Sequence, residues 1–245
     1  SSAASDVYKR QRYMNIYKSL FLGLVCSAGM HCTFAQTTVW NPDNQNGTFT
    51  NPIMWGDWPD PDLIRVDDKF YLVSTSMHYV PGCPIAVSED LVNWEMAGYA
   101  LDRYDEDPKY DMQGGNLYLN GAWATTIRHH NGKFYVGFCT PYGWGRETGH
   151  FSICIADDVK GPWERTIFPE YLYDPGLFFD EDGKVYVVHG QGTLYLTELN
   201  SDVKSVKGKP VKIWQGGFKN AHELGGGFGM EGSHTVSYTH LRAHE

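Results

Sequence analysis

Three acidic residues in this chain recur at a spacing that could serve proton-transfer chemistry. Asp60 and Asp174 each precede a proline at the same position of an internal repeat, and Glu231 follows Asp174 by 57 residues, about one repeat later. Carboxyl groups crowded into one channel resist joint ionisation, so one can stay protonated near neutral pH while another is charged. Such a set offers a general acid and a general base.

Each acid also has an ordinary structural explanation. Asp-Pro pairs frequently begin turns, and a Glu before Gly-Ser often lies on a solvated loop. For any one of the three alone, this explanation would be preferred. Their common register favours the catalytic interpretation, because two hold one repeat position and the third falls where the period predicts.

The elements that position these acids are predicted by the repeat itself. Residues 60–71, 124–135 and 174–186 fit one template of a short apolar strand, a polar turn and a β-rich strand, which predicts a β-hairpin. A second hairpin is indicated after the first two by a run that ends in tryptophan, and more weakly after the third. These runs are Ile85–Trp94, Ile153–Trp163 and Leu194–Asn200.

Two hairpins make a four-stranded unit, and units starting at 60, 124 and 174 recur every 50 to 64 residues, as propeller blades do. A sandwich or jelly roll lacks a repeated hairpin with the same turn and trailing tryptophan. We therefore predict an all-β chain with about three blades and the start of a fourth. Because three blades leave sheet edges open, we expect the natural protein to continue well past residue 235.

The ends of the chain are predicted to stand outside this domain. Residues 1–13 and 236–245 resemble translated adapter sequence, with ordinary disordered termini as the alternative. Residues 14–36 read as a secretory signal peptide, too short in its apolar run to span a membrane. The catalytic domain is expected over 37–235, secreted or periplasmic, with lipid anchoring at Cys26 left open as an alternative.

Composition narrows the class of partner. Without residues 1–36 and 236–245, 15 Lys and Arg face 27 Asp and Glu, a formal charge of −12. This balance disfavours nucleic acid and anionic lipid and suits a neutral substrate. Cys83, Cys139 and Cys154 have no metal-ligand spacing and are expected as buried thiols, with one disulfide left open.

The motifs Trp58–Tyr71, Val80–Trp94, Tyr173–Phe178 and Glu231–His234 resemble family 43 of the glycoside hydrolases. The resemblance implies a five-bladed β-propeller that hydrolyses with inversion, with Asp60 as general base, Asp174 as pKa modulator and orienting residue, and Glu231 as general acid. Inversion needs room for a water molecule, so the Asp60 and Glu231 carboxyls are expected about 6.5–9.5 Å apart.

The segment Ser74–Gly82 resembles the β-xylosidase and α-L-arabinofuranosidase branch of that family. This implies an enzyme that removes xylose or arabinofuranose from plant hemicellulose or its oligosaccharides. One departure is Thr125-Thr126, where many members carry Pro-Asp or Pro-Ser, which puts a polar contact in doubt. We expect the chain alone to be inactive, because further blades would complete the channel and pocket.

Aromatic side chains are candidates for stacking on sugar rings. Packing explains most of them, including Trp94 and Trp163 of the repeat. The candidates for substrate binding are Trp58, His78, Tyr79, Trp123 and Trp144.

Two other functions are weighed against hydrolysis. A carbohydrate-binding propeller without catalysis would keep the aromatic residues but need no paired acids, so the three acids count against it. A metal site at Asp60, Asp174 and nearby histidines lacks ligand spacing, so no metal ligand is predicted. No catalytic cofactor is expected, a structural calcium ion stays open, and His189 is left unassigned.

Overall fold

The computed structural model describes residues 40–143, 148–215 and 230–235. The chain divides into the units Ser1–Asn41 and Pro42–Glu245, and all the strands described belong to the second. The predicted adapter-like ends, the signal peptide and Trp144 lie outside the described residues.

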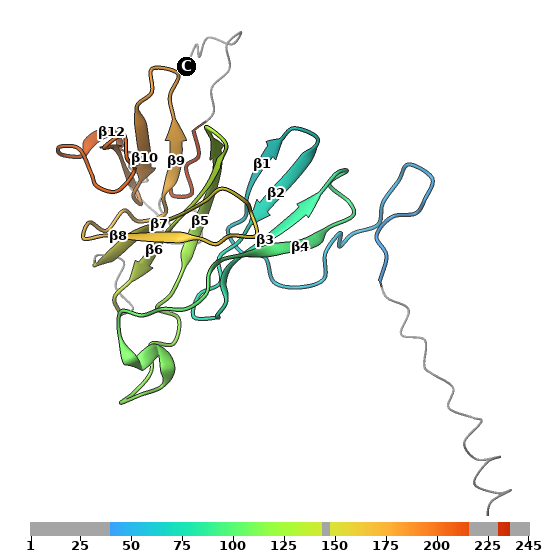
Figure 1. Ribbon diagram of the computed structural model, residues 1–245, viewed down its shortest axis with the longest axis horizontal. Coiled ribbons are helices and arrows are strands. Elements are labelled where there is room, and N and C mark those ends of the chain that lie inside the picture. Colours follow the sequence, from blue (N-terminus) through green and yellow to red (C-terminus); the bar gives the residue numbers. More distant parts are fainter. Residues whose placement is uncertain (1–39, 144–147, 216–229, 236–245) are drawn as a thin grey trace, which may run out of the picture. The chain divides into compact units, whose positions relative to one another are not determined.

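The described residues form three four-stranded antiparallel sheets, each built from consecutive strands (Figure 1). Sheet 1 comprises β1 (Asp62–Val66), β2 (Lys69–Val73), β3 (Gly82–Ser88) and β4 (Glu95–Leu101). Sheet 2 comprises β5 (Trp123–His130), β6 (Lys133–Pro141), β7 (Gly149–Ala156) and β8 (Glu164–Phe168). Sheet 3 comprises β9 (Gly176–Phe179), β10 (Val185–His189), β11 (Thr193–Leu199) and β12 (Val211–Gln215). The predicted all-β class and the four-strand unit are confirmed.

The polar turns of the repeat close the first hairpin of sheets 1 and 2, as predicted. Val66 pairs with Lys69 across the first turn and His130 with Lys133 across the second. Asn131 and Gly132 both have positive φ, 49° and 73°. Two such residues in succession match the turn whose twist fits a two-residue hairpin.

Apolar side chains on both faces of β6 are buried, so sheet 2 contributes to two hydrophobic cores. Phe134, Val136 and Phe138 belong to a core cluster shared with sheet 1, whereas Tyr135 belongs to a second cluster shared with sheet 3. Successive side chains of a strand point to opposite faces, so one strand can supply both cores. Each fully buried large apolar side chain stabilises the fold by about 1.5–3 kcal/mol.

The first strand of each sheet packs against that of the next: β5 contacts both β1 and β9. This arrangement brings the starts of the three template hairpins together. The longest connection between neighbouring sheets is the β4–β5 loop, residues 102–122, which includes the short 3₁₀ helix η2 (Pro108–Asp111).

The three cysteines of the described part, Cys83, Cys139 and Cys154, are free and buried, as expected of apolar thiols. All five residues of β12 are exposed. No helix in the part of the chain that the structure describes has the length and apolarity that a membrane crossing requires.

Candidate active site

The repeat position that carries Asp60 and Asp174 has one distinctive backbone conformation. Asp60, Ala124 and Asp174 have φ values of 46°, 48° and 55°, all in the left-handed region. Residues with a Cβ adopt this region at a cost of about 1–3 kcal/mol, and such residues cluster at functional sites. The three template positions therefore share the same kink near the start of β1, β5 and β9.

Thr75 connects Asp60 to the next sheet. The Thr75 hydroxyl donates to Oδ2 of Asp60 at 2.9 Å and accepts from the Ala124 N–H at 2.7 Å. The Thr75 N–H donates to the carbonyl of Pro59 at 3.0 Å, which holds the residue before Asp60. Asp60 is an exposed residue, and the hydrogen bond from Thr75 fixes one of its two carboxylate oxygens.

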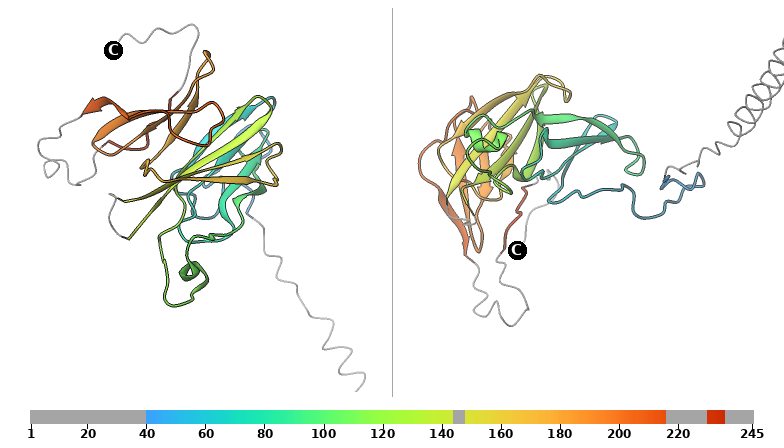
Figure 2. Two further views of the ribbon diagram at one scale, coloured as in Figure 1. Left: turned by 60° about the vertical axis from the view of Figure 1, so that its left-hand side comes forward. Right: turned by 90° about the horizontal axis from the view of Figure 1, so that it is seen from below.

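Glu231 is held by residues that flank Asp174 and β10. The Tyr173 hydroxyl and the Gln191 amide both donate to Oε2 of Glu231, at 3.0 and 2.8 Å. One residue earlier, the carbonyl of Met230 accepts from the Gly192 N–H at 2.9 Å. The segment 230–235, dark red in Figure 1 and Figure 2, thus runs beside sheet 3 with its acid oriented by two donors.

A close backbone contact also fixes this segment. A Cβ on Gly176, the first residue of β9, would lie 2.2 Å from the carbonyl oxygen of Ser233. No side chain fits there, so glycine is what allows the Glu231 segment to approach β9.

The pKa of Asp174 responds to the charges of the other two acids. Burial raises the pKa of Asp174, the negative charges of Glu231 and Asp60 raise it further, and a hydrogen bond from the Gly232 N–H opposes them; the result is about 6. Like charges that share a site disfavour joint ionisation in this way. The structure therefore brings Asp60, Asp174 and Glu231 into one electrostatic neighbourhood.

A fourth acid, Asp62, was missed by the sequence reasoning. It is 9% exposed at the start of β1 and accepts three hydrogen bonds on Oδ2 from β5. The motif Asp60-Pro-Asp62 carried a signal for it, but the two other repeats have no acid at the equivalent position, so the register gave no support.

The aromatic candidates separate into different surroundings. The ring of His78 packs against those of Tyr79 and Tyr118 at tilted angles, with ring centroids 4.4 and 3.9 Å apart, and Tyr118 was not among the predicted residues. Tyr79 and Tyr118 are 66% and 61% exposed, so this cluster offers aromatic surface to solvent. The indole N–H of Trp123 is already used by the carbonyl of Leu119, at 2.6 Å. Trp58 is partly buried, two residues before Asp60.

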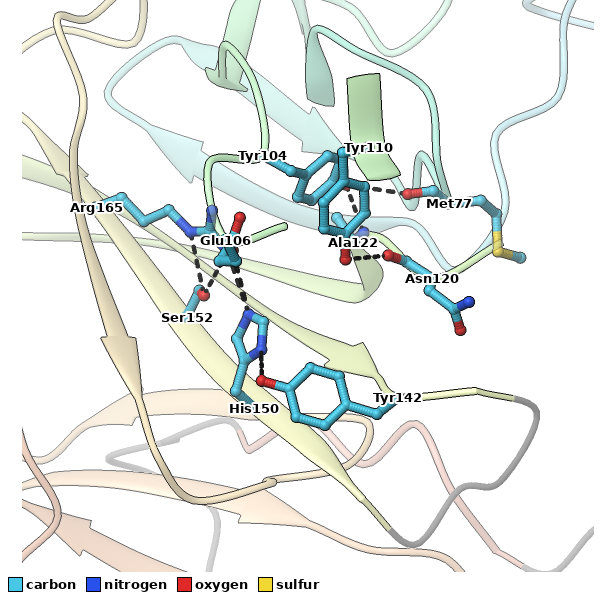
Figure 3. A network of polar contacts seen from close by, with 10 residues as sticks. All are labelled: Met77, Tyr104, Glu106, Tyr110, Asn120, Ala122, Tyr142, His150, Ser152 and Arg165. Atoms are coloured by element: carbon cyan, nitrogen blue, oxygen red, sulfur yellow. Dashed lines mark hydrogen bonds and ion pairs between the residues drawn. The ribbon is translucent and has the colours of Figure 1, made fainter. Parts of the chain in front are cut away.

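The loop that carries Tyr118 is anchored by a buried charge network (Figure 3). Glu106 pairs with Arg165 of β8, and with Nε2 of His150 at 3.5 Å. Arg165 also donates to the hydroxyl of Ser152, at 3.2 Å from Nε. Burial alone would raise the pKa of Glu106, but hydrogen bonds from His150 and Arg165 and the charge of Arg165 lower it to about 2.

The tyrosines of the same loop fix its other end, as Figure 3 shows. The Tyr104 hydroxyl donates to the carbonyl of Met77 at 3.0 Å and accepts from the Ala122 N–H at 2.6 Å. Tyr110 stacks on Tyr104 with centroids 4.5 Å apart. Met77 precedes His78 and Ala122 follows Tyr118 by four residues, so these bonds fix the backbone near both sides of the His78–Tyr118 contact.

A model of one protein family matches residues 49–239, and its description is glycosyl hydrolases family 43. The chain belongs to glycosyl hydrolase family 43.

Relatives within family 43 carry two related activities in their names. A β-xylosidase of Formosa agariphila is 35% identical over 159 residues, 63% of this chain and 26% of the relative. A non-reducing end α-L-arabinofuranosidase of Bacteroides ovatus is 39% identical over 158 residues, 63% of this chain and 29% of the relative. The chain thus spans about a quarter to a third of the length of these relatives.

Solved structures of family 43 proteins also match this chain over only part of their own length. A bifunctional family 43 protein of Bacteroides eggerthii has a TM-score of 0.67 at 35% identity, covering 78% of this chain and 24% of its own. A xylan β-1,4-xylosidase of Bacillus halodurans has a TM-score of 0.61 at 28% identity, covering 69% of this chain and 34% of its own.

The described part of this family 43 chain contains no set of side chains that could bind a metal ion. Within those residues no group of three or more His, Cys, Asp and Glu side chains is placed to hold a metal ion. His189 is 7% exposed, burial lowers its pKa to about 4, and its Nε2 lies 2.8 Å from the Thr197 hydroxyl. This histidine is therefore a neutral, hydrogen-bonded group of the sheet 3 core.

Proposed function

We propose that this chain is the acid-bearing part of an inverting glycoside hydrolase that removes xylose or arabinofuranose from plant hemicellulose or its oligosaccharides. The observation that carries the proposal is the convergence of the three acidic segments: β5 contacts β1 and β9, the strands that follow Asp60 and Asp174, and the Glu231 segment approaches β9 at Gly176. The names of the family 43 relatives support the two sugars. The complete catalytic domain is proposed as a five-bladed propeller, of which sheets 1 to 3 are three blades.

In the proposed mechanism Glu231 is the general acid. Its carboxyl protonates the departing glycosidic oxygen, while the donors Tyr173 and Gln191 orient the carboxyl group through Oε2. Asp174 lies beside this segment, with its Oδ2 3.8 Å from the place that a Cβ on Gly232 would take, and it is the proposed orienting residue.

Asp60 is the proposed general base. Thr75 occupies Oδ2 of Asp60, which orients the carboxylate while the other oxygen can accept a proton from the attacking water. Attack from the face opposite the leaving group inverts the anomeric centre. Two carboxyl groups suffice for this reaction, so the proposal includes no catalytic cofactor. We also propose that the protein acts outside the cytoplasm, where polymeric substrate is met.

The proposal is tested with the full-length protein that carries this chain. We expect cleavage of p-nitrophenyl β-D-xylopyranoside or α-L-arabinofuranoside, with little cleavage of the β-D-glucopyranoside. Proton NMR during the first minutes should show the inverted anomer as the first product. Release of the retained anomer would contradict the mechanism, and sugar binding without any cleavage would support a carbohydrate-binding protein instead.

A further inference from the structure

Asp62 links the strand that follows Asp60 to sheet 2. Its Oδ2 accepts from the Thr126 hydroxyl at 2.9 Å, the Ile127 N–H at 2.8 Å and the Arg128 guanidinium at 2.6 Å. Arg128 is itself largely buried, with 16% of its side chain exposed. A buried carboxylate with this many donors is a fixed point between β1 and β5.

The same oxygen reaches the segment that carries Glu231. Nδ1 of His234, three residues after Glu231, lies 3.4 Å from Oδ2 of Asp62. At the other end of the segment, Met230 is held by the Gly192 N–H. The backbone around Glu231 is therefore fastened on one side to sheet 3 and on the other, through Asp62, to sheets 1 and 2.

Thr126 extends the network to the strand that follows Asp174. Its hydroxyl donates to Asp62 and accepts from the N–H of Leu177 in β9, at 3.3 Å. The Asp62 carboxylate thus lies at the junction of the three chain segments that bear Asp60, Asp174 and Glu231.

Asp62 is charged under all ordinary conditions. Burial would raise its pKa, but the hydrogen bond from His234, the charge of Arg128 and the Ile127 N–H together lower it to about 2. The ion pair of Asp62 with Arg128 therefore persists across the working pH range of an enzyme.

We propose that Asp62, acting through His234, is a positioning residue that sets the place of the general acid Glu231 relative to Asp60 and the substrate. The inference rests on the proposed function. Neither residue needs to touch the reacting atoms. A displacement of about 1 Å in a catalytic group can cost about 10²-fold in rate, so a small shift of the segment suffices.

The test uses leaving groups that differ in their need for a proton. The 2,4-dinitrophenolate leaving group departs from its glycoside without protonation by a general acid. Cleavage of xylobiose and of 4-methoxyphenyl xyloside requires that protonation. If arabinofuranosides are the better substrates, the matching arabinofuranoside series replaces the xylosides. The variants are His234→Ala, which removes a side chain that is 33% exposed, and Asp62→Asn. Glu231→Gln is the reference for loss of the acid.

We expect His234→Ala to lower kcat about 10²-fold on xylobiose and less than about threefold on the dinitrophenyl glycoside, with KM little changed. Asp62→Asn should show the same dependence, and the double variant should lose less than the product of the two single losses. His130→Ala is the matched control: this histidine stacks on Phe179 at the far end of β5, centroids 4.4 Å apart. It should leave all substrates unaffected.

The outcomes separate the inference from the proposed function. A wild-type protein that cleaves none of the glycosides overturns both. If wild type cleaves them and Glu231→Gln shows the leaving-group dependence, but His234→Ala loses activity equally on every substrate or not at all, the positioning role is wrong. Should Asp62→Asn fail to fold, His234→Ala alone decides between these results.

Discussion

At the scale of single residues, Asp174 is an acid whose ionised form the fold disfavours. Its pKa is raised from 3.8 to about 6 by burial and by the charges of Glu231 and Asp60. A carboxyl whose folded pKa exceeds its unfolded value lowers stability as the pH rises between the two values, and the full penalty applies above the folded pKa. Below about pH 4 there is no penalty.

Asp174→Asn should therefore stabilise the protein in a pH-dependent way. We expect its unfolding free energy to exceed that of wild type by about 1–2 kcal/mol at pH 7, after discounting for solvent screening, and to equal it below pH 4. Asparagine keeps an acceptor for the Gly232 N–H, so packing is preserved. Thermal unfolding across pH 3.5–8 measures the difference, and a difference independent of pH would contradict the electrostatic explanation.

The stabilised variant should also be a poorer enzyme. Asp174→Asn removes a carboxyl whose pKa is about 6, so kcat/KM should fall and its pH profile should lose the ionisation near pH 6. A profile that falls in height and keeps its shape would limit Asp174 to an orienting role.

At the scale of elements, the approach of the Glu231 segment to β9 depends on Gly176. An alanine Cβ would lie 2.2 Å from the Ser233 carbonyl oxygen, so the segment must move away. We expect Gly176→Ala to lower kcat about 10²-fold. Kinetics on p-nitrophenyl xyloside, or the arabinofuranoside if it is the better substrate, test this.

The control for that variant is Gly132→Ala in the β5–β6 turn. Gly132 has φ of 73°, and a Cβ at this position would have no atom within 4 Å, so alanine strains only the local backbone. It should cost about 1 kcal/mol of stability and leave kcat unchanged. Equal loss of kcat in both variants would mean that instability, and not the displaced segment, explains the effect.

The β4–β5 loop should respond to loss of the Glu106 charge. Glu106→Gln removes the ion pair with Arg165 and the carboxylate partner of His150, and we expect a loss of about 1.5–3 kcal/mol in unfolding free energy. Because this loop carries Tyr118 against His78, KM for oligosaccharides should rise more than kcat falls.

The pH dependence of the Glu106 effect follows from its lowered pKa. The stabilisation is complete above the unfolded value of 4.5 and is lost as the pH falls toward 2. Asp105→Asn is the control. The Asp105 side chain is 76% exposed, so its ion pair with Arg103 should contribute less than about 1 kcal/mol to stability. Chemical denaturation at pH 7 and pH 3 measures both variants, and equal effects of the two would contradict the anchoring role.

The sequence predicted those elements that depend on local chemistry. The turn at Asn131-Gly132 and the Asp-Pro pairs at 60 and 174 are patterns of adjacent residues, so the hairpins and their starting acids could be placed. Asp62, Thr75 and His234 could not be found, because their partners lie on other sheets and no local period encodes that adjacency. Tyr118 was missed because its loop follows no repeat.

At the scale of the whole molecule, net charge predicts how the protein meets its substrate. The segment between residues 37 and 235 carries a formal charge of −12, yet a neutral sugar is neither attracted nor repelled by that field. We expect kcat/KM on neutral xylo- or arabino-oligosaccharides to change less than about twofold between about 50 and 500 mM NaCl. A steep fall with salt would indicate a charged substrate.

The central claim is that Asp60, Asp174 and Glu231 form one hydrolytic site. Its most direct test is kcat/KM of Asp60→Asn on the better of the two p-nitrophenyl substrates, with the exposed neighbour Asp57→Asn as control. We predict a loss of at least about 10²-fold for Asp60→Asn, with an unchanged circular dichroism spectrum, and wild-type activity for Asp57→Asn. Activity of Asp60→Asn within a few-fold of wild type would contradict the account.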